Sequence, residues 1–95
     1  MSRCVFSADA AADLGDIAEY IARDNPTAAR DWLAAVRHRC ELLADHPFNG
    51  EVRPGFGVAD CRSLSVGNYV VFFRPSPTGV EIARIVHGSR DLRTL

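Results

Sequence analysis

The chain has 95 residues and a mass of 10.4 kDa, which is the size of one domain and too small for two cores. Its hydrophobic fraction of 47% and charged fraction of 24% exclude disordered and fibrous proteins. All 11 basic residues are arginines, and 12 acidic residues bring the net charge to −1, which argues against a general nucleic-acid coat. We therefore expect residues 1–95 to form one globular domain.

The composition also predicts the compartment. No apolar stretch approaches the roughly 18 residues of a membrane span, and the N-terminus lacks a signal-peptide core, so we expect a cytoplasmic protein with no membrane partner. The three cysteines, Cys4, Cys40 and Cys61, are odd in number and widely separated, which favours reduced core thiols. Because no phosphate-binding loop and no metal-ligand spacing occur, we expect no cofactor and no metal.

The first half of the chain predicts a short strand and a helical hairpin. The apolar pair Val5-Phe6 ends at Ser7, a favourable N-cap for a helix that reaches about Asp24. Asn25 and Pro26 are typical of a new helix start, and this second helix extends from Pro26 to Asp45. Because almost no linker separates the helices, they should be antiparallel. The first helix has an apolar stripe of Ala10, Leu14, Ile17 and Ile21, and an opposite, acidic face of Asp9, Asp13, Asp16 and Glu19.

The second half has the period of β-strands. Residues 48–57 are rich in turn-forming types and predict a surface loop. Three strands should follow, joined by a two-residue turn at residues 67–68 and a longer loop at residues 75–79. The expected strands of this antiparallel meander are Cys61–Val66, Tyr69–Arg74 and Val80–His87.

The resulting order, β-α-α-β-β-β, predicts an α+β fold with the helical hairpin packed on an antiparallel sheet. The middle strand is apolar on both alternating faces, as expected of a central strand that is covered on one face and partly covered on the other. Because the hairpin supplies cover for one face only, we expect the other face to be a working surface or to be covered by a partner.

Candidate functional side chains gather in the strand half. The set comprises Arg62, Arg74, Arg84, Arg90 and Arg93, together with Tyr69 and His87. Arginines can hold phosphates, tyrosine can stack on a base and histidine can transfer a proton, which are the requirements of metal-free RNA cleavage. Strict alternation places Arg84 and His87 on opposite faces, so they converge only if a bulge or the strand end changes the parity.

Ordinary structural roles compete with these functions. Arg62 and Arg74 can pair with Asp60 or Glu81 as surface ion pairs of little energetic weight. Tyr69 can serve as packing, Trp32 as core or interface, and His87 can have a local role at its strand end.

The net charge is close to zero, but the charges are distributed unevenly between the two halves of the chain. Residues 1–51 carry five arginines and nine acids, for a net charge of −4, whereas residues 52–95 carry six arginines and three acids, for +3. The strand half therefore suits an acidic partner segment or a target that carries nucleic acid.

From about Cys4 to Leu92 the chain resembles the RelE/ParE superfamily of toxins from bacterial type II toxin–antitoxin modules. The resemblance rests on four segments in order, which are Phe6–Leu14, Asp24–Ala29, Arg62–Arg74 and Val80–Asp91. Within the superfamily the chain is closer to the ParE branch, because of the long hairpin with its Asn25-Pro26 turn, the Arg62-Ser63-Leu64 stretch and the His87-Gly88 ending.

This resemblance implies a toxin that inhibits growth by poisoning DNA gyrase. It also implies neutralisation by an adjacently encoded, ParD-like antitoxin, whose C-terminal segment folds on the toxin and which alone contacts operator DNA. The alternative is a RelE-type, ribosome-dependent mRNA endoribonuclease, for which Arg62, Arg84 and His87 occupy catalytic positions. That branch typically has lysines and a C-terminal tyrosine, which this chain lacks. A third possibility is an inactive relative that acts only within a repressor complex.

The same resemblance assigns site residues. Expected target-binding residues are Tyr69, Arg74, Arg90 and Arg93. Expected antitoxin-binding residues are Trp32, Leu33, Val71 and Phe73. The antitoxin segment is expected on an exposed strand edge, in a groove of the helical hairpin around Trp32, or on the incompletely covered sheet face.

Overall fold

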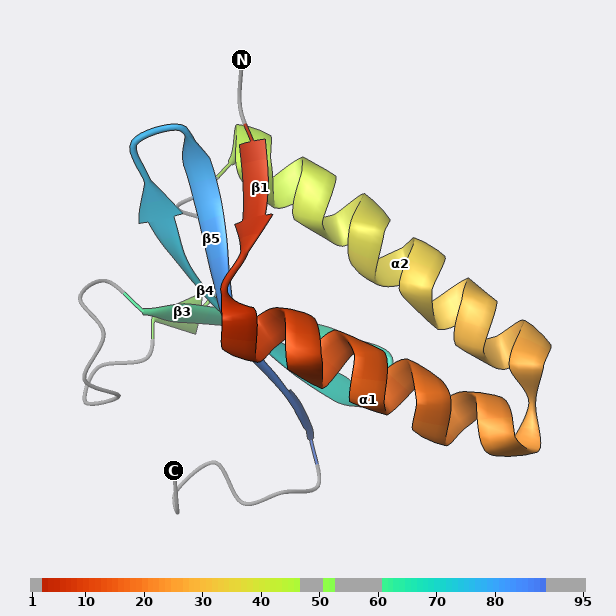
Figure 1. The fold of residues 1–95 in the computed structure, drawn as a ribbon. Coiled ribbons are helices and arrows are strands. Elements are labelled where there is room, and N and C mark those ends of the chain that lie inside the picture. The colour runs from red at the N-terminus through yellow and green to blue at the C-terminus, as the bar shows by residue number, and fades with distance from the viewer. Residues whose placement is uncertain (1–2, 47–50, 53–60, 89–95) are drawn as a thin grey trace.

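Two long helices lie on one face of a five-stranded sheet in the computed structural model, which describes residues 3–46, 51–52 and 61–88 (Figure 1). In chain order the elements are β1 (Arg3–Phe6), α1 (Ala8–Asp24), α2 (Pro26–Asp45), β2 (Glu51–Val52), β3 (Arg62–Val66), β4 (Tyr69–Ser76) and β5 (Gly79–His87). The predicted α+β fold, with its strand, helical hairpin and three further strands, is confirmed.

Two capping side chains set the helix boundaries where the sequence predicts them. The Ser7 hydroxyl accepts a hydrogen bond from the Ala10 N–H at 3.0 Å, and the Asn25 side chain accepts one from the Ala28 N–H at 3.0 Å. The Asn25 N–H also donates to the Ile21 carbonyl at 3.0 Å. One residue thus ends α1 and begins α2, which makes the reversal between the helices very tight.

The sheet has the order β1-β5-β4-β3-β2. β1 pairs with β5 in parallel, and the remaining pairs are antiparallel. β2 lies inside the predicted surface loop, so that prediction is wrong at residues 51–52, which pair with β3. A strand of two residues is too short to show a period of its own.

The turn between β4 and β5 is shorter than predicted. β4 continues through Pro75 to Ser76 and β5 starts at Gly79, so Pro77 and Thr78 alone connect the strands. Gly79 has φ +147°, and a Cβ at this position would collide with the backbone of Arg3. This glycine therefore lets β1 approach β5 closely.

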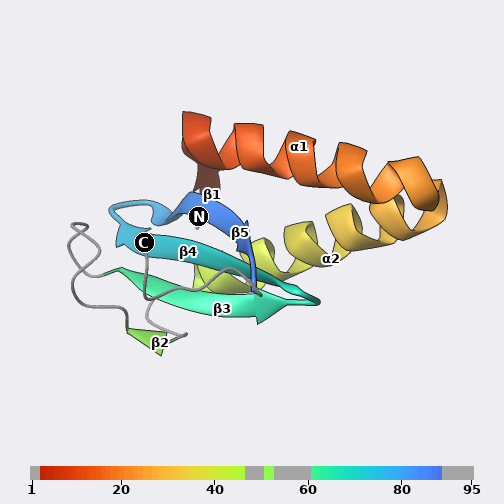
Figure 2. The ribbon, with the colours of Figure 1, turned by 90° about the horizontal axis from the view of Figure 1, so that it is seen from below.

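The core lies between the helices and the sheet, and Figure 2 shows both helices on the same side of the strands. Phe73, Ile82 and Val80 are fully buried there, at 0% exposure. On the opposite face Val70 and Phe72 are also buried, at 8% and 5%. This burial agrees with the expectation that the second face of the central strand is partly covered, and it shows that the cover at the centre of this face comes from the chain itself.

Truncation of a core residue should be costly. We expect Phe73→Ala to lower the free energy of unfolding by about 3 to 5 kcal/mol, because it removes a large buried ring and leaves a cavity. Val5→Ala, on the exposed face of β1 at 48% exposure, should change it by less than roughly 0.5 kcal/mol. Urea unfolding of both variants tests this. Equal losses would contradict the assigned core.

Candidate functional site

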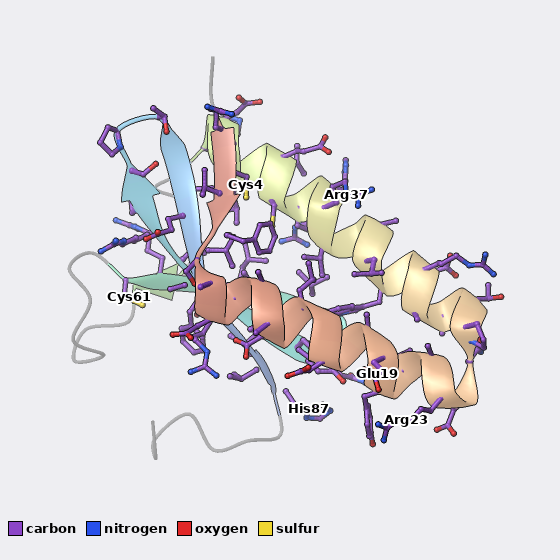
Figure 3. The ribbon with its side chains drawn as sticks, in the orientation of Figure 1. Cys4, Glu19, Arg23, Arg37, Cys61 and His87 are labelled. Atoms are coloured by element: carbon purple, nitrogen blue, oxygen red, sulfur yellow. The ribbon has the colours of Figure 1, made fainter. Side chains whose placement is uncertain are left out.

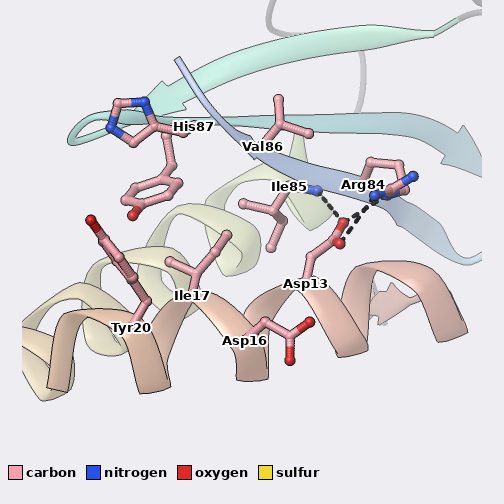
Figure 4. A pocket seen from close by; sticks show the side chains of 9 residues that line it. Asp13, Asp16, Ile17, Tyr20, Arg84, Ile85, Val86 and His87 are labelled. Carbon is pink, nitrogen blue, oxygen red and sulfur yellow. Dashed lines mark hydrogen bonds and ion pairs between the residues drawn. The ribbon is translucent and has the colours of Figure 1, made fainter. Parts of the chain in front are cut away.

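A groove of about 600 Å³ lies between α1 and the C-terminal part of β5 (Figure 4). It exists because β1 ends at Phe6, opposite Ile82, whereas β5 continues to His87. Among the strands that the structure describes, none lies beside the last part of β5 on this edge, and α1 lies there instead. The groove is lined by Asp13, Asp16, Ile17, Tyr20, Tyr69, Arg84, Ile85, Val86 and His87.

Side chains from the start of α1 satisfy the exposed backbone of this edge. The Ser7 hydroxyl donates to the Ala83 carbonyl at 2.9 Å. The Asp13 carboxylate accepts a hydrogen bond from the Ile85 N–H at 2.9 Å. An unpaired strand edge is a site for adventitious strand pairing, so these contacts protect the fold as well as fix α1 on the sheet.

Asp13 also holds Arg84 through two guanidinium nitrogens. The Arg84 Nε donates to Asp13 Oδ2 at 2.7 Å, and Nη2 donates to Oδ1 at 3.2 Å. These hydrogen bonds, and then the charge of Asp13, raise the pKa of Arg84 above its ordinary value. Arg84 is thus engaged within the free protein. The Asp13 side chain is only 16% exposed and that of Arg84 is 55% exposed.

The role of Asp13 was not predicted, and its placement among outward-facing acids is wrong. Its partners lie 71 and 72 residues away, so no local pattern indicates them. The sequence does indicate that Asp13 faces the sheet more than the other acids do. It lies three residues after Ala10 and four before Ile17, which places it beside the apolar stripe of the helix.

Aromatic rings form the other end of the groove. The Tyr69 ring packs on Trp32 with centroids 5.1 Å apart and meets His87 edge-on at 5.0 Å. Tyr69 is only 8% exposed, whereas Tyr20 on α1 is 66% exposed. Burial raises the pKa of Tyr69, and the nearby Tyr20 adds to that rise, so the phenol remains protonated.

Arg84 and His87 line the same groove but do not share a sheet face. Arg84 is opposite Phe72, and His87 is opposite Tyr69. A bulge lies at Ala83, where the register shifts between Phe72 and Phe73. The bulge precedes both Arg84 and His87, so it does not change how they are placed relative to each other. Their side chains remain on opposite faces of β5, as the sequence predicts. Both side chains still line one groove, because this groove extends along the edge of β5, which side chains from either face can reach.

Arg62 lies away from this groove. Arg62 pairs with Phe73 at the start of β3. His87 pairs with Tyr69, which in turn pairs with Val66 at the other end of β3. At roughly 3.4 Å per residue and about 4.8 Å per strand, an offset of four residues and two strands puts the Cα atoms of Arg62 and His87 about 17 Å apart. The structure therefore brings Arg84 and His87 to one groove without Arg62.

The remaining predicted target residues divide into two groups. Arg74 is exposed and pairs with Glu81 at 2.7 Å, the structural alternative that its sequence position suggested. Arg90 and Arg93 lie outside the described residues, as does Asp60.

The predicted antitoxin residues differ in exposure. Val71 and Phe73 are 1% and 0% exposed, beneath the helices, and Trp32 is 9% exposed. Leu33 is half-buried and lines a second groove, of about 510 Å³, between β1 and the helical hairpin. We call this the hairpin groove; it is lined by Cys4, Phe6, Leu14, Leu33, Val36, Arg37, Cys40, Glu41, Ala44 and Asp45. Trp32, around which the sequence predicted such a groove, does not line it and packs on Tyr69 instead.

Two further properties of the described residues concern metal binding and membrane insertion. Among residues 3–46, 51–52 and 61–88, no group of three or more His, Cys, Asp or Glu side chains is placed to hold a metal ion. Within the same ranges, neither helix combines the length and apolar character required to cross a membrane.

Loss of the Asp13 carboxylate should destabilise the protein. We expect Asp13→Ala to lower the free energy of unfolding by about 1 to 3 kcal/mol, because the Ile85 N–H loses its acceptor and Arg84 its partner. Asp16→Ala is the matched control, since Asp16 is exposed on the same helix and lines the same groove. It should cost less than roughly 0.5 kcal/mol in urea unfolding. Equal effects of the two substitutions would refute the role of Asp13.

Comparison with known proteins identifies the family. The family model of the ParE toxin of the type II toxin-antitoxin system, parDE, matches residues 4–92. A solved chain of the chromosomal ParDE TA system from P. aeruginosa has the same fold, with a TM-score of 0.71 at 24% identity, over 92% of this chain and 96% of that chain. A comparison with curated proteins gave no significant match. Because the family match extends over nearly the whole sequence, the chain belongs to the ParE toxin family.

Proposed function

We propose that this ParE-family toxin inhibits growth by binding and poisoning DNA gyrase in the cytoplasm, and that a ParD-like antitoxin encoded beside it neutralises it. The observation that carries the proposal is the match to the ParE toxin family over residues 4–92. On this proposal the protein binds its target without catalysing a reaction, and it reaches operator DNA only through its antitoxin.

The arrangement of the candidate residues supports binding over catalysis. Metal-free RNA cleavage needs several groups around one phosphate. Here Arg84 is held by Asp13, and the Cα atom of Arg62 is about 17 Å from that of His87 at ordinary strand spacings. The presence of Arg84 and His87 along one groove keeps the RelE-type endoribonuclease as a second candidate.

The predicted target residues take different parts in this proposal. Arg74 is exposed and is available to an acidic or nucleic-acid-bearing target at the cost of an exposed ion pair with Glu81. Tyr69 is buried, so on this proposal it contributes indirectly, by packing its ring against His87 and holding that side chain in place. Arg90 and Arg93 remain predictions from the sequence.

We further propose that the antitoxin segment occupies the hairpin groove. Leu33 gives this groove an accessible apolar position, with Phe6 and Leu14 beside it. Helices that insert apolar side chains into such grooves are a recurrent form of peptide recognition. Val71 and Phe73 contribute beneath the surface, as core residues that support the groove.

A pair of assays with the purified chain tests the target. We expect the chain to inhibit DNA supercoiling by gyrase and to leave a cell-free translation reaction, with its message, intact. Cut message with unaffected gyrase would establish the endoribonuclease instead. No effect in either assay, from a folded preparation, would favour an inactive relative.

A substitution in the hairpin groove tests the antitoxin site. We expect Leu33→Glu to weaken antitoxin binding at least about tenfold, because a buried carboxylate would face apolar partner side chains. Growth inhibition should persist, and co-expressed antitoxin should no longer restore growth.

Leu42→Glu provides the control for this experiment. Leu42 lies on the same helix, is 48% exposed and lines neither groove. This variant should be neutralised like the parent chain. Undiminished binding of the antitoxin to a folded Leu33→Glu variant would place the antitoxin elsewhere.

A further inference from the structure

Two of the three cysteines face each other across the hairpin groove. Cys4 is opposite Val80 in the parallel β1–β5 register, which directs it to the helix side of the sheet (Figure 3). Cys40 is a residue of α2. Both line the hairpin groove, Cys4 half-buried and Cys40 at 3% exposure. Each of these thiols is the largest influence on the pKa of the other, so the two side chains interact within this groove.

The two thiols differ in reactivity. The interaction with the Cys40 thiol lowers the pKa of Cys4 below its ordinary value, against the opposing effects of burial and of the Glu41 charge. The same interaction and burial raise the pKa of Cys40. Cys4 is therefore the more readily ionised and the more accessible thiol, and Cys40 is placed behind it.

We propose that Cys4 and Cys40 form a dithiol oxidation site, at which a peroxide converts them into an intramolecular disulfide that joins β1 to α2. A partly accessible thiol with a second thiol beside it in the same groove is the usual arrangement of a reversible oxidation site. The proposal does not depend on what the hairpin groove binds.

The chemistry balances with hydrogen peroxide as the oxidant. The Cys4 thiolate attacks one peroxide oxygen, an S–O bond forms, the O–O bond breaks, and hydroxide leaves and is protonated to water. The Cys40 sulfur then attacks the Cys4 sulfenic acid and loses its proton. The S–S bond forms, the S–O bond breaks and a second water leaves, so two thiols are oxidised and one peroxide is reduced.

The third cysteine is an internal control. Cys61 is 4% exposed and packs with Val70 and Phe72 on the opposite face of the sheet, so it shares no groove with the other two. The disulfide would also close a loop that contains all of α1 and the hairpin turn, which should raise the thermal unfolding midpoint.

The experiment treats the reduced full chain with one equivalent of hydrogen peroxide, followed by alkylation under denaturing conditions and mass spectrometry. We expect a loss of two hydrogen masses, a Cys4–Cys40 linked peptide and alkylation of Cys61 alone. Cys61→Ser should behave like the parent, and the oxidised chain should unfold at a higher temperature than the reduced chain. Cys40→Ser should accumulate a dimedone-reactive sulfenic acid at Cys4.

Three outcomes would overturn the proposal. These are oxidation of Cys61 before Cys4, dimers linked between chains in place of the internal disulfide, and a Cys4 oxyacid in the parent with Cys40 still alkylatable. Because peptide mapping of the parent chain decides among them, the test does not depend on the folding of a variant. Cys4→Ser, at the half-exposed position, should abolish the linked peptide.

Discussion

The carboxylate of Asp13 joins the helical half of the protein to its sheet. It accepts the Ile85 N–H and two N–H groups of Arg84, all from the part of β5 that extends beyond β1. Without this contact the edge of β5 would present an unsatisfied backbone donor beside α1, and the helix would lack its polar attachment at this point. The groove along β5 and the position of Arg84 both depend on it.

This constraint shapes the functional account. A guanidinium already bound by a carboxylate is a weaker candidate for transition-state stabilisation than one that is aimed at an open site. Arg62 is remote from His87, and Tyr69 is packed between Trp32 and His87. Together with membership of the ParE toxin family, these placements favour a protein that acts by binding. The sequence adds an uneven distribution of charge, with a net charge of −4 in residues 1–51 and +3 in residues 52–95.

Local signals in the sequence predicted the local structure. Ser7, Asn25 and Pro26 set the helix boundaries because capping and proline geometry act within one turn. The strands beyond residue 61 were predicted from their β-branched and aromatic residues and from the turn-forming residues between them. The parallel pairing of β1 with β5, the pairing of residues 51–52 and the Asp13–Arg84 contact were not predicted, because each joins distant segments and leaves no periodic signal. For the same reason Arg62, Arg84 and His87 could be nominated from residue type but not placed relative to one another.

Amide hydrogen exchange at Ile85 tests the central claim most directly. The Ile85 N–H points to Asp13 on the strandless edge, whereas its neighbour Val86 pairs with Val70 of β4. We expect slow exchange at both amides in the parent chain, and a selective loss of protection at Ile85 in Asp13→Ala. Fast exchange at Ile85 in the parent, or protection unchanged by the substitution, would contradict the attachment of α1 to β5 through Asp13.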